Sequence, residues 1–65
     1  MRHQIEIEGM SCDHCVRAVE RALRAVSGVE RVEVELGRAT VEATETASPS
    51  ALRSAIEAEG YRPKP

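Results

Sequence analysis

Apolar and polar residues alternate strictly at the start of the chain. His3, Ile5 and Ile7 alternate with Gln and Glu residues up to Gly9. A period of two is typical of a strand with one buried face and one solvated face, which here is acidic. We therefore predict a first strand that ends at Gly9.

A second alternating region surrounds a short turn. Apolar residues occupy every second position over 32–36 and again over 41–43, and Gly37-Arg38 lies between the two runs. Two such runs joined by a short turn that contains glycine are typical of a β-hairpin. The pattern predicts a hairpin with Leu36 inside its first strand and with its turn at Gly37 and Arg38.

Helical spacing appears in two other regions. From Cys15 to Val26 apolar residues recur three or four positions apart, Asp13 and Ser11 are candidate N-caps, and Gly28 follows the end. These features predict a first helix directly after the segment that holds both cysteines.

The second helical region begins at Ser48-Pro49, which is a favourable helix start. An apolar stripe follows, and Gly60 is placed as a C-terminal stop. Pro63 and Pro65 have no N–H for a ladder of hydrogen bonds, so any last strand after this helix must be short and lie at an edge.

The predicted order is strand, helix, strand, strand, helix, strand. This order suits an α+β, ferredoxin-like βαββαβ sandwich, in which a four-stranded antiparallel sheet carries both helices on one face. We expect one domain over residues 1–65. Its predicted core consists of Ile5, Ile7, Val19, Leu23, Val26, Val32, Val34, Val41, Leu52 and Ile56.

Length and composition limit the function. A chain of 65 residues can bury a modest core but no deep cavity with an elaborate catalytic site, so we expect a small surface site and no enzyme activity. Tyr61 is the only aromatic residue, and the formal net charge is -2. Base stacking and an overall basic field are therefore lacking, and nucleic acid is not expected as a partner.

The N-terminal residues and the cysteine content bear on location. The start of the chain lacks the uninterrupted apolar stretch of an export signal, and no segment is apolar enough to span a membrane. Two cysteines in such a chain are more typical of a metal-ligand or redox pair than of a structural disulfide. We expect a cytoplasmic protein without membrane insertion. Met1 and the complete set of predicted elements favour an independent protein over a regulatory domain detached from a transporter.

The most informative segment is GMSCDHC, residues 9–15, between the first strand and the first helix. Two thiolates three positions apart can bind one ion, and the positive end of the helix dipole, with Arg17 and Arg21, favours ionised sulfur. Thiolates prefer copper(I), whereas a structural zinc site normally needs four protein ligands. The pattern indicates an exposed, low-coordinate copper(I) site at Cys12 and Cys15.

The same segment resembles the GMxCxxC metal loop of the heavy-metal-associated domain family, in particular its bacterial copper-chaperone type. The resemblance covers essentially the whole chain, including the helix exit at 28–29 and the Gly-Tyr pair at 60–61. The ending YRPKP departs from the family's usual apolar last strand.

The resemblance implies roles for individual residues. Cys12 and Cys15 would carry copper(I), Met10 would pack beneath the loop, and Tyr61 would approach the site from the loop after the second helix. We expect Met10 to be a buried loop anchor rather than a copper ligand. Capping the core is an equal alternative role for Tyr61. Delivery of the ion would be to the metal-binding domain of a copper-transporting P-type ATPase, by exchange of thiolate ligands.

The residues around the cysteines bear on the choice of metal. Zinc- and cadmium-handling relatives often place a carboxylate directly before the first cysteine, where this chain has Ser11, and that favours a monovalent ion. Asp13 is available to a harder metal. We expect His14 to be solvated or to tune the site, because adjacent helical residues point in different directions. We expect His3 to be an ordinary strand residue.

Charged residues suggest how a partner docks. Arg17, Arg21 and Arg24 are predicted on the outward face of the first helix near the loop, and we expect them to meet an acidic patch on the partner in a salt-sensitive contact. A generic solvated face is the ordinary alternative. The opposite, open face of the sheet carries five glutamates, namely Glu6, Glu8, Glu33, Glu35 and Glu42. We expect a monomer, with a metal-bridged homodimer as an alternative.

Other functions use the same cysteine pair. A simple disulfide or a pair of core thiols is the ordinary alternative, and a thiol-disulfide oxidoreductase is the rival of another class. The small size and the lack of proline between Arg2 and Ser48 argue against a thioredoxin-type enzyme. A chaperone, resistance or sensor module for mercury, zinc or cadmium would share the thiol chemistry, and only metal competition separates it from copper delivery.

Overall fold

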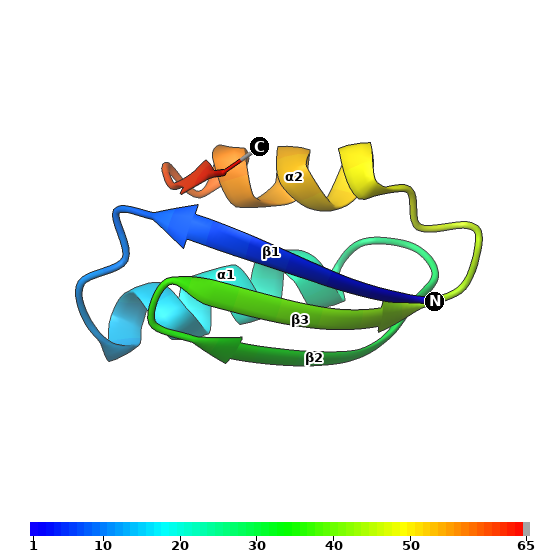
Figure 1. The fold of residues 1–65 in the computed structure, drawn as a ribbon, viewed down its shortest axis with the longest axis horizontal. Coiled ribbons are helices and arrows are strands. Elements are labelled where there is room, and N and C mark those ends of the chain that lie inside the picture. Colours follow the sequence, from blue (N-terminus) through cyan, green and yellow to red (C-terminus); the bar gives the residue numbers. More distant parts are fainter. Residues whose placement is uncertain (65) are drawn as a thin grey trace.

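The computed structural model describes residues 1–64 and contains a four-stranded antiparallel sheet with two helices (Figure 1). The elements in chain order are β1 (Arg2–Glu8), α1 (Asp13–Arg24), β2 (Val29–Glu35), β3 (Arg38–Ala43), α2 (Pro49–Ala58) and β4 (Arg62–Pro63). The strands lie in the order β2-β3-β1-β4. This confirms the predicted ferredoxin-like βαββαβ fold. The expectation for Pro65 lies outside the described residues.

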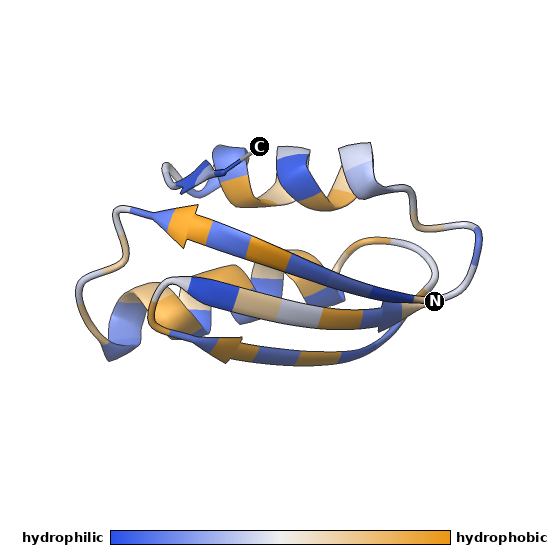
Figure 2. Cartoon of the chain, in the orientation of Figure 1, coloured by the Kyte–Doolittle hydropathy of each residue, from blue (hydrophilic) through white to orange (hydrophobic). Residues whose placement is uncertain are grey.

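Both helices pack on the same face of the sheet. Ile5 of β1 and Val41 of β3 lie in one buried cluster with Leu23 of α1 and Leu52 of α2. Hydrophobic and hydrophilic residues alternate along the strands, as the bands of colour in Figure 2 show, and this alternation gives each strand one apolar face. Alternate residues of a strand point to opposite faces, so one face of each strand enters the core and the other stays in solvent.

The predicted core is confirmed with two adjustments. Eight of its ten residues are buried, and the other two, Val26 and Val34, are half-buried and pack against the cluster. Four buried residues were not predicted, namely Ala39, Ala43, Ala47 and Pro63. The first two lie on β3, which has strands on both sides and helices above it, so even small side chains there lose all contact with water.

The hairpin turn lies one residue earlier than predicted. Leu36 and Gly37 form the turn, Glu35 pairs with Arg38, and Leu36 is 58% exposed. Gly37 has a φ of 84°, which glycine adopts without steric cost and which the second central residue of a type II turn requires. The expectation that Arg38 belongs to the turn and Leu36 to the strand is therefore wrong.

This shift changes the outer face of the sheet. Arg38 lies beside glutamates of both neighbouring strands, and Glu42 lies between Arg2 and Arg31. The Nη2 atom of Arg2 is 3.6 Å from Oε1 of Glu42. The predicted glutamates are on this face, but three arginines interleave with them, so the face alternates in charge and is not uniformly acidic.

The helix ends and the last strand follow local chemistry. Ser48 caps α2, with its hydroxyl accepting a hydrogen bond from the N–H of Ala51 at 3.1 Å. The N-cap of α1 is Cys12, whose side chain makes no capping bond, so neither Ser11 nor Asp13 is the cap. Strand β4 is two residues long and lies at the edge of the sheet, as predicted. No helix within residues 1–64 is long and apolar enough to cross a membrane.

Candidate metal site

Cys12 and Cys15 lie together at one end of the molecule. The chain leaves β1 at Gly9, whose φ is 93°, and a short loop leads into α1 (Figure 1). Cys12 is the extended N-cap of α1, and Cys15 lies in the first turn, where its N–H donates to the Cys12 carbonyl at 3.1 Å. The helical turn between them brings the two Sγ atoms to 3.7 Å.

Both sulfurs are free and reachable. Cys12 is exposed and Cys15 is half-buried, and neither forms a disulfide. Soft thiolate sulfurs at this separation are suited to copper(I) and other soft ions. Within residues 1–64 no group of three or more His, Cys, Asp and Glu side chains lies close enough to hold a metal ion. The two thiols are the ligand-type side chains that this loop brings together.

Tyr61 affects the charge of the site. The pKa of Cys15 is lowered from 9.0 to about 6. The largest cause is hydrogen bonding by the Tyr61 side chain, and the next is hydrogen bonding by the backbone of Ser11. Burial opposes this shift, and contacts with Cys12 add to it. In return, the pKa of Tyr61 is raised, because its hydroxyl hydrogen-bonds the sulfur and is partly desolvated. Cys15 is therefore mostly thiolate at neutral pH.

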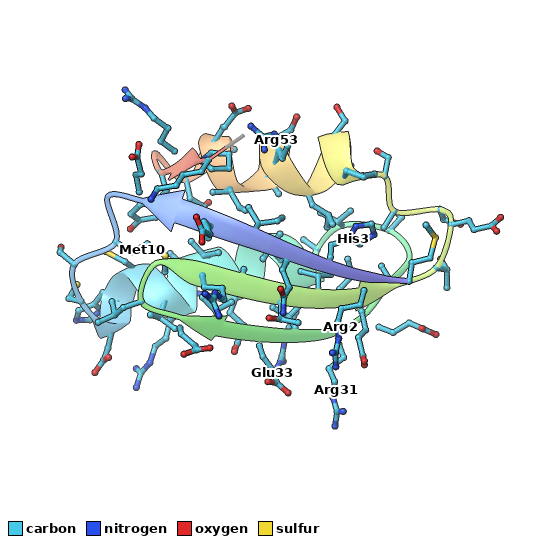
Figure 3. All side chains as sticks on the ribbon, viewed as in Figure 1. Arg2, His3, Met10, Arg31, Glu33 and Arg53 are labelled. Carbon is cyan, nitrogen blue, oxygen red and sulfur yellow. The ribbon has the colours of Figure 1, made fainter. Side chains whose placement is uncertain are left out.

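Two residues of the loop support this arrangement. Met10 is half-buried and packs against the core, next to the N-terminal end of α1 (Figure 3). A Cβ on Gly9 would lie 3.8 Å from Cδ1 of the Tyr61 ring. The ring thus lies against the start of the loop, which explains how a residue after α2 reaches a site that precedes α1.

The remaining loop residues lie apart from the thiol pair or point to solvent. Ser11, Asp13 and His14 are exposed. Sequence reasoning considered the side chain of Ser11 and missed that its backbone contacts the sulfur. His3 lies in β1 near the other end of the strand and is not part of the site (Figure 3).

The arginines of α1 are only partly as predicted. Arg17 and Arg21 are exposed on the helix that begins at the site. Arg24 is the last residue of α1 and forms an ion pair of 3.8 Å with Glu20. At 1.5 Å per residue it lies roughly 18 Å along the axis from Cys12. The expectation that Arg24 lies near the loop is wrong, because the helix carries it away.

The fold and the exposed thiol pair define a class of small ferredoxin-like domain suited to soft metal ions. The sequence model of the heavy-metal-associated domain matches residues 4–62. The chain belongs to this family. It is 43% identical over 60 residues to "Copper chaperone CopZ" of Staphylococcus haemolyticus, with 88% of each chain covered.

Solved structures and longer proteins also resemble the chain. The structure titled "CopZ metallochaperone" superposes with a TM-score of 0.95 at 36% identity, covering 98% of this chain and 100% of that one. "Copper-transporting ATPase 1" of Rhizobium meliloti is 47% identical over 89% of this chain, which corresponds to 7% of the ATPase. "Mercuric reductase" of Shewanella putrefaciens is 46% identical over 88% of this chain, which corresponds to 11% of the reductase.

Proposed function

We propose that this protein is a cytoplasmic copper(I) chaperone that binds one ion between Cys12 and Cys15. It delivers the ion to the metal-binding domain of a copper-transporting P-type ATPase. The observation that carries the proposal is the pair of free thiols, 3.7 Å apart on the surface at the N-terminus of α1. Similarity along most of the chain to a relative named as a copper chaperone supports copper as the cargo. The protein acts as a single-domain monomer over residues 1–65 and catalyses no reaction.

The exposed site suits transfer by ligand exchange. A thiol of the partner loses its proton and binds the ion as a third sulfur ligand, and one cysteine of this chain then leaves and takes up a proton. Cys12 is the more exposed ligand and thus the more accessible one. Hydrogen bonding by Tyr61 stabilises the thiolate form of Cys15, so this ligand needs little deprotonation at neutral pH. The ion therefore stays bound to sulfur throughout the exchange and is not released into bulk water.

Metal competition tests the binding step. The reduced protein is titrated anaerobically with copper(I), zinc and mercury against chelators of known affinity, together with Cys12→Ser, Cys15→Ser and the control Ser54→Ala. Tight binding of one copper(I), lost in both cysteine variants and kept in Ser54→Ala, supports the proposal. Stronger retention of zinc, or no metal binding beside a readily cycling disulfide, contradicts it.

Transfer to a purified metal-binding domain of a copper-transporting ATPase tests delivery. Arg17 and Arg21 are exposed cations on the helix that begins at the site, so an acidic surface beside the partner's cysteines would attract them. Arg17→Glu and Arg21→Glu should each slow transfer, and the slowing should diminish in added salt. Arg31→Glu, with the same charge change on β2, is the control. Equal slowing in all three variants would contradict docking through α1.

Mercury handling is the second candidate, and the similarity to a short part of a mercuric reductase favours it. Both metals suit a two-thiolate site, so affinity for mercury does not by itself decide. The rate of copper(I) transfer separates the two functions. If the protein handles mercury, copper(I) should move from this chain to the ATPase domain no faster than to a small chelator of equal affinity.

A further inference from the structure

Only part of the outer edge of β1 is covered by β4. Strand β4 pairs with Ile7 and Glu8, and the N–H of Lys64 donates to the carbonyl of Glu6 at 2.7 Å. Towards its N-terminus β1 continues beyond this cover (Figure 1). No hydrogen bond from the described residues 1–64 reaches the outer side of Arg2 or Gln4. Half of the strand is therefore an open edge.

The backbone direction at this edge follows from two hydrogen bonds. The N–H of Ile7 donates towards β3, to Gly37, whereas the carbonyl of Glu6 faces β4. Successive residues of an antiparallel strand point their backbone groups to opposite sides. The N–H and C=O groups of Arg2 and Gln4 therefore point outwards, so the edge offers two donors and two acceptors in a row.

A positively charged groove of about 560 Å³ lies along this edge. Its charged lining consists of Arg2, Arg38, Arg53, Lys64 and Glu6. Arg2 is ion-paired with Glu42 and Arg38 lies beside Glu6 and Glu35, so the positive charge of the groove comes from Arg53 and Lys64. Arg53 on α2 is held in place because it donates to the carbonyl of Lys64 at 2.8 Å. Figure 3 labels Arg53 on α2, whereas Arg2 is labelled beside Arg31 on the other side of the sheet. The groove is formed by α2, β1 and the end of the chain, away from the thiol pair.

We propose that this open edge binds an extended, acidic segment of a partner protein, which adds a strand beside Arg2 and Gln4. The segment's backbone pairs with the four free groups, and its carboxylates lie near Arg53 and Lys64. The inference goes beyond the proposed function and does not depend on which metal is bound. A partner held here leaves Cys12 and Cys15 free, because the edge is at the other end of β1 from the metal loop.

Charge and hydrogen-bonding chemistry select this occupant. A second copy of the chain would bring its own Arg53 and Lys64 into the same groove, and the like charges would repel. A DNA backbone supplies acceptors for the two N–H groups but no donors for the two carbonyls, and the 2′-hydroxyls of RNA do not repeat the alternation of donors and acceptors that a strand presents. An acidic peptide alone satisfies both the backbone groups and the charge.

Synthetic peptides on the full chain test the proposal. The probe is a capped eight-residue peptide of alternating Glu and Val, and its control replaces every Glu with Lys. On the ¹⁵N-labelled protein we expect the acidic peptide to shift the amide signals of Arg2 and Gln4 and to slow their hydrogen exchange. The Lys peptide should do neither.

Three variants separate edge pairing from general attraction. Lys64→Glu reverses one cation of the groove, and Gln4→Pro removes an N–H that β3 does not use. Each should weaken binding of the acidic peptide by about tenfold or more, while Arg31→Glu on the outer face leaves binding within about twofold. Lys64→Glu and the exchange data test the proposal even where Gln4→Pro loosens the sheet.

Several results would overturn it. Slow exchange of the Gln4 amide without any peptide would mean that the edge is already covered. Signals that change with protein concentration alone would indicate a second copy as the occupant. Equal loss of binding in Arg31→Glu, or no binding at all, would mean that the cations only protect the edge from unwanted pairing.

Discussion

Tyr61, next to the last strand, is the largest influence on the charge of Cys15, in the first turn of α1. Hydrogen bonding by the Tyr61 side chain dominates the lowering of the Cys15 pKa from 9.0 to about 6. The tyrosine ring lies against Gly9 at the start of the loop, where an added Cβ would be 3.8 Å from ring Cδ1. The thiol chemistry of the loop thus depends on a residue from the far end of the chain.

Removing the Tyr61 hydroxyl should raise the pKa of Cys15. In a Cys12→Ser background, which isolates one thiol, the rate of alkylation by iodoacetamide is measured against pH with and without Tyr61→Phe. We expect the midpoint in Tyr61→Phe to lie closer to the ordinary value of 9.0 than the midpoint in the Cys12→Ser parent. Ser54→Ala removes a hydroxyl elsewhere and should leave the midpoint unchanged. An unchanged midpoint in Tyr61→Phe would show that other contacts hold the thiolate.

The same pKa makes stability depend on pH. Cys15 titrates near pH 6 in the folded protein and near 9.0 in the unfolded chain, so the unfolded state binds the extra proton between these values. Its stabilising contribution is complete above pH 9.0 and is lost as the pH falls through about 6. Under reducing conditions, urea unfolding should show the wild type losing stability relative to Cys15→Ser over this window. A difference that is constant across the window would refute the linkage.

Gly28 should tolerate no side chain. Its φ is 91°, and an added Cβ would lie 2.7 Å from Oγ1 of Thr44 and 2.9 Å from N of Ala47. Gly60 is a matched control with a φ of 90° and nothing within 4 Å. Gly60→Ala should cost about 1 kcal/mol of unfolding free energy for the backbone conformation alone. Gly28→Ala should cost about 3 kcal/mol, because overpacking is added. Equal costs in urea unfolding would contradict the crowding.

Replacing either of two leucines with alanine should have very different effects on stability. Leu23 is fully buried at 0% exposure, whereas Leu36 in the hairpin turn is 58% exposed. Leu23→Ala should lower the free energy of unfolding by about 3 kcal/mol, since it leaves a cavity in the core. Leu36→Ala should change it by less than about 0.5 kcal/mol. A large effect of Leu36→Ala would indicate that Leu36 is buried within the strand, as its alternating pattern predicted.

The candidate site was predictable as far as its chemistry is local. The spacing of Cys12 and Cys15 and the helix that follows them are written in consecutive residues, and one helical turn is enough to bring the sulfurs together. The neighbours that act on those sulfurs were harder to predict. The backbone of Ser11 contributes through loop conformation, which no residue pattern specifies. The distance of Arg24 from the loop, in contrast, already follows from the predicted helix at about 1.5 Å per residue.

The sequence by itself determined the order and type of the elements, because alternation and helical spacing are local properties that decide which face of each segment can be buried. It determined the short edge strand as well, since Pro63 has no N–H to donate. Tertiary structure decided what depends on neighbours distant in the chain. Ala39 is buried because β3 lies between two strands, Arg38 sits among glutamates because the turn fixes its register, and Tyr61 reaches Cys15 because the loop after α2 folds back onto the loop before α1. Packing brings such residues into contact, and the periodicity within a single segment does not predict these contacts.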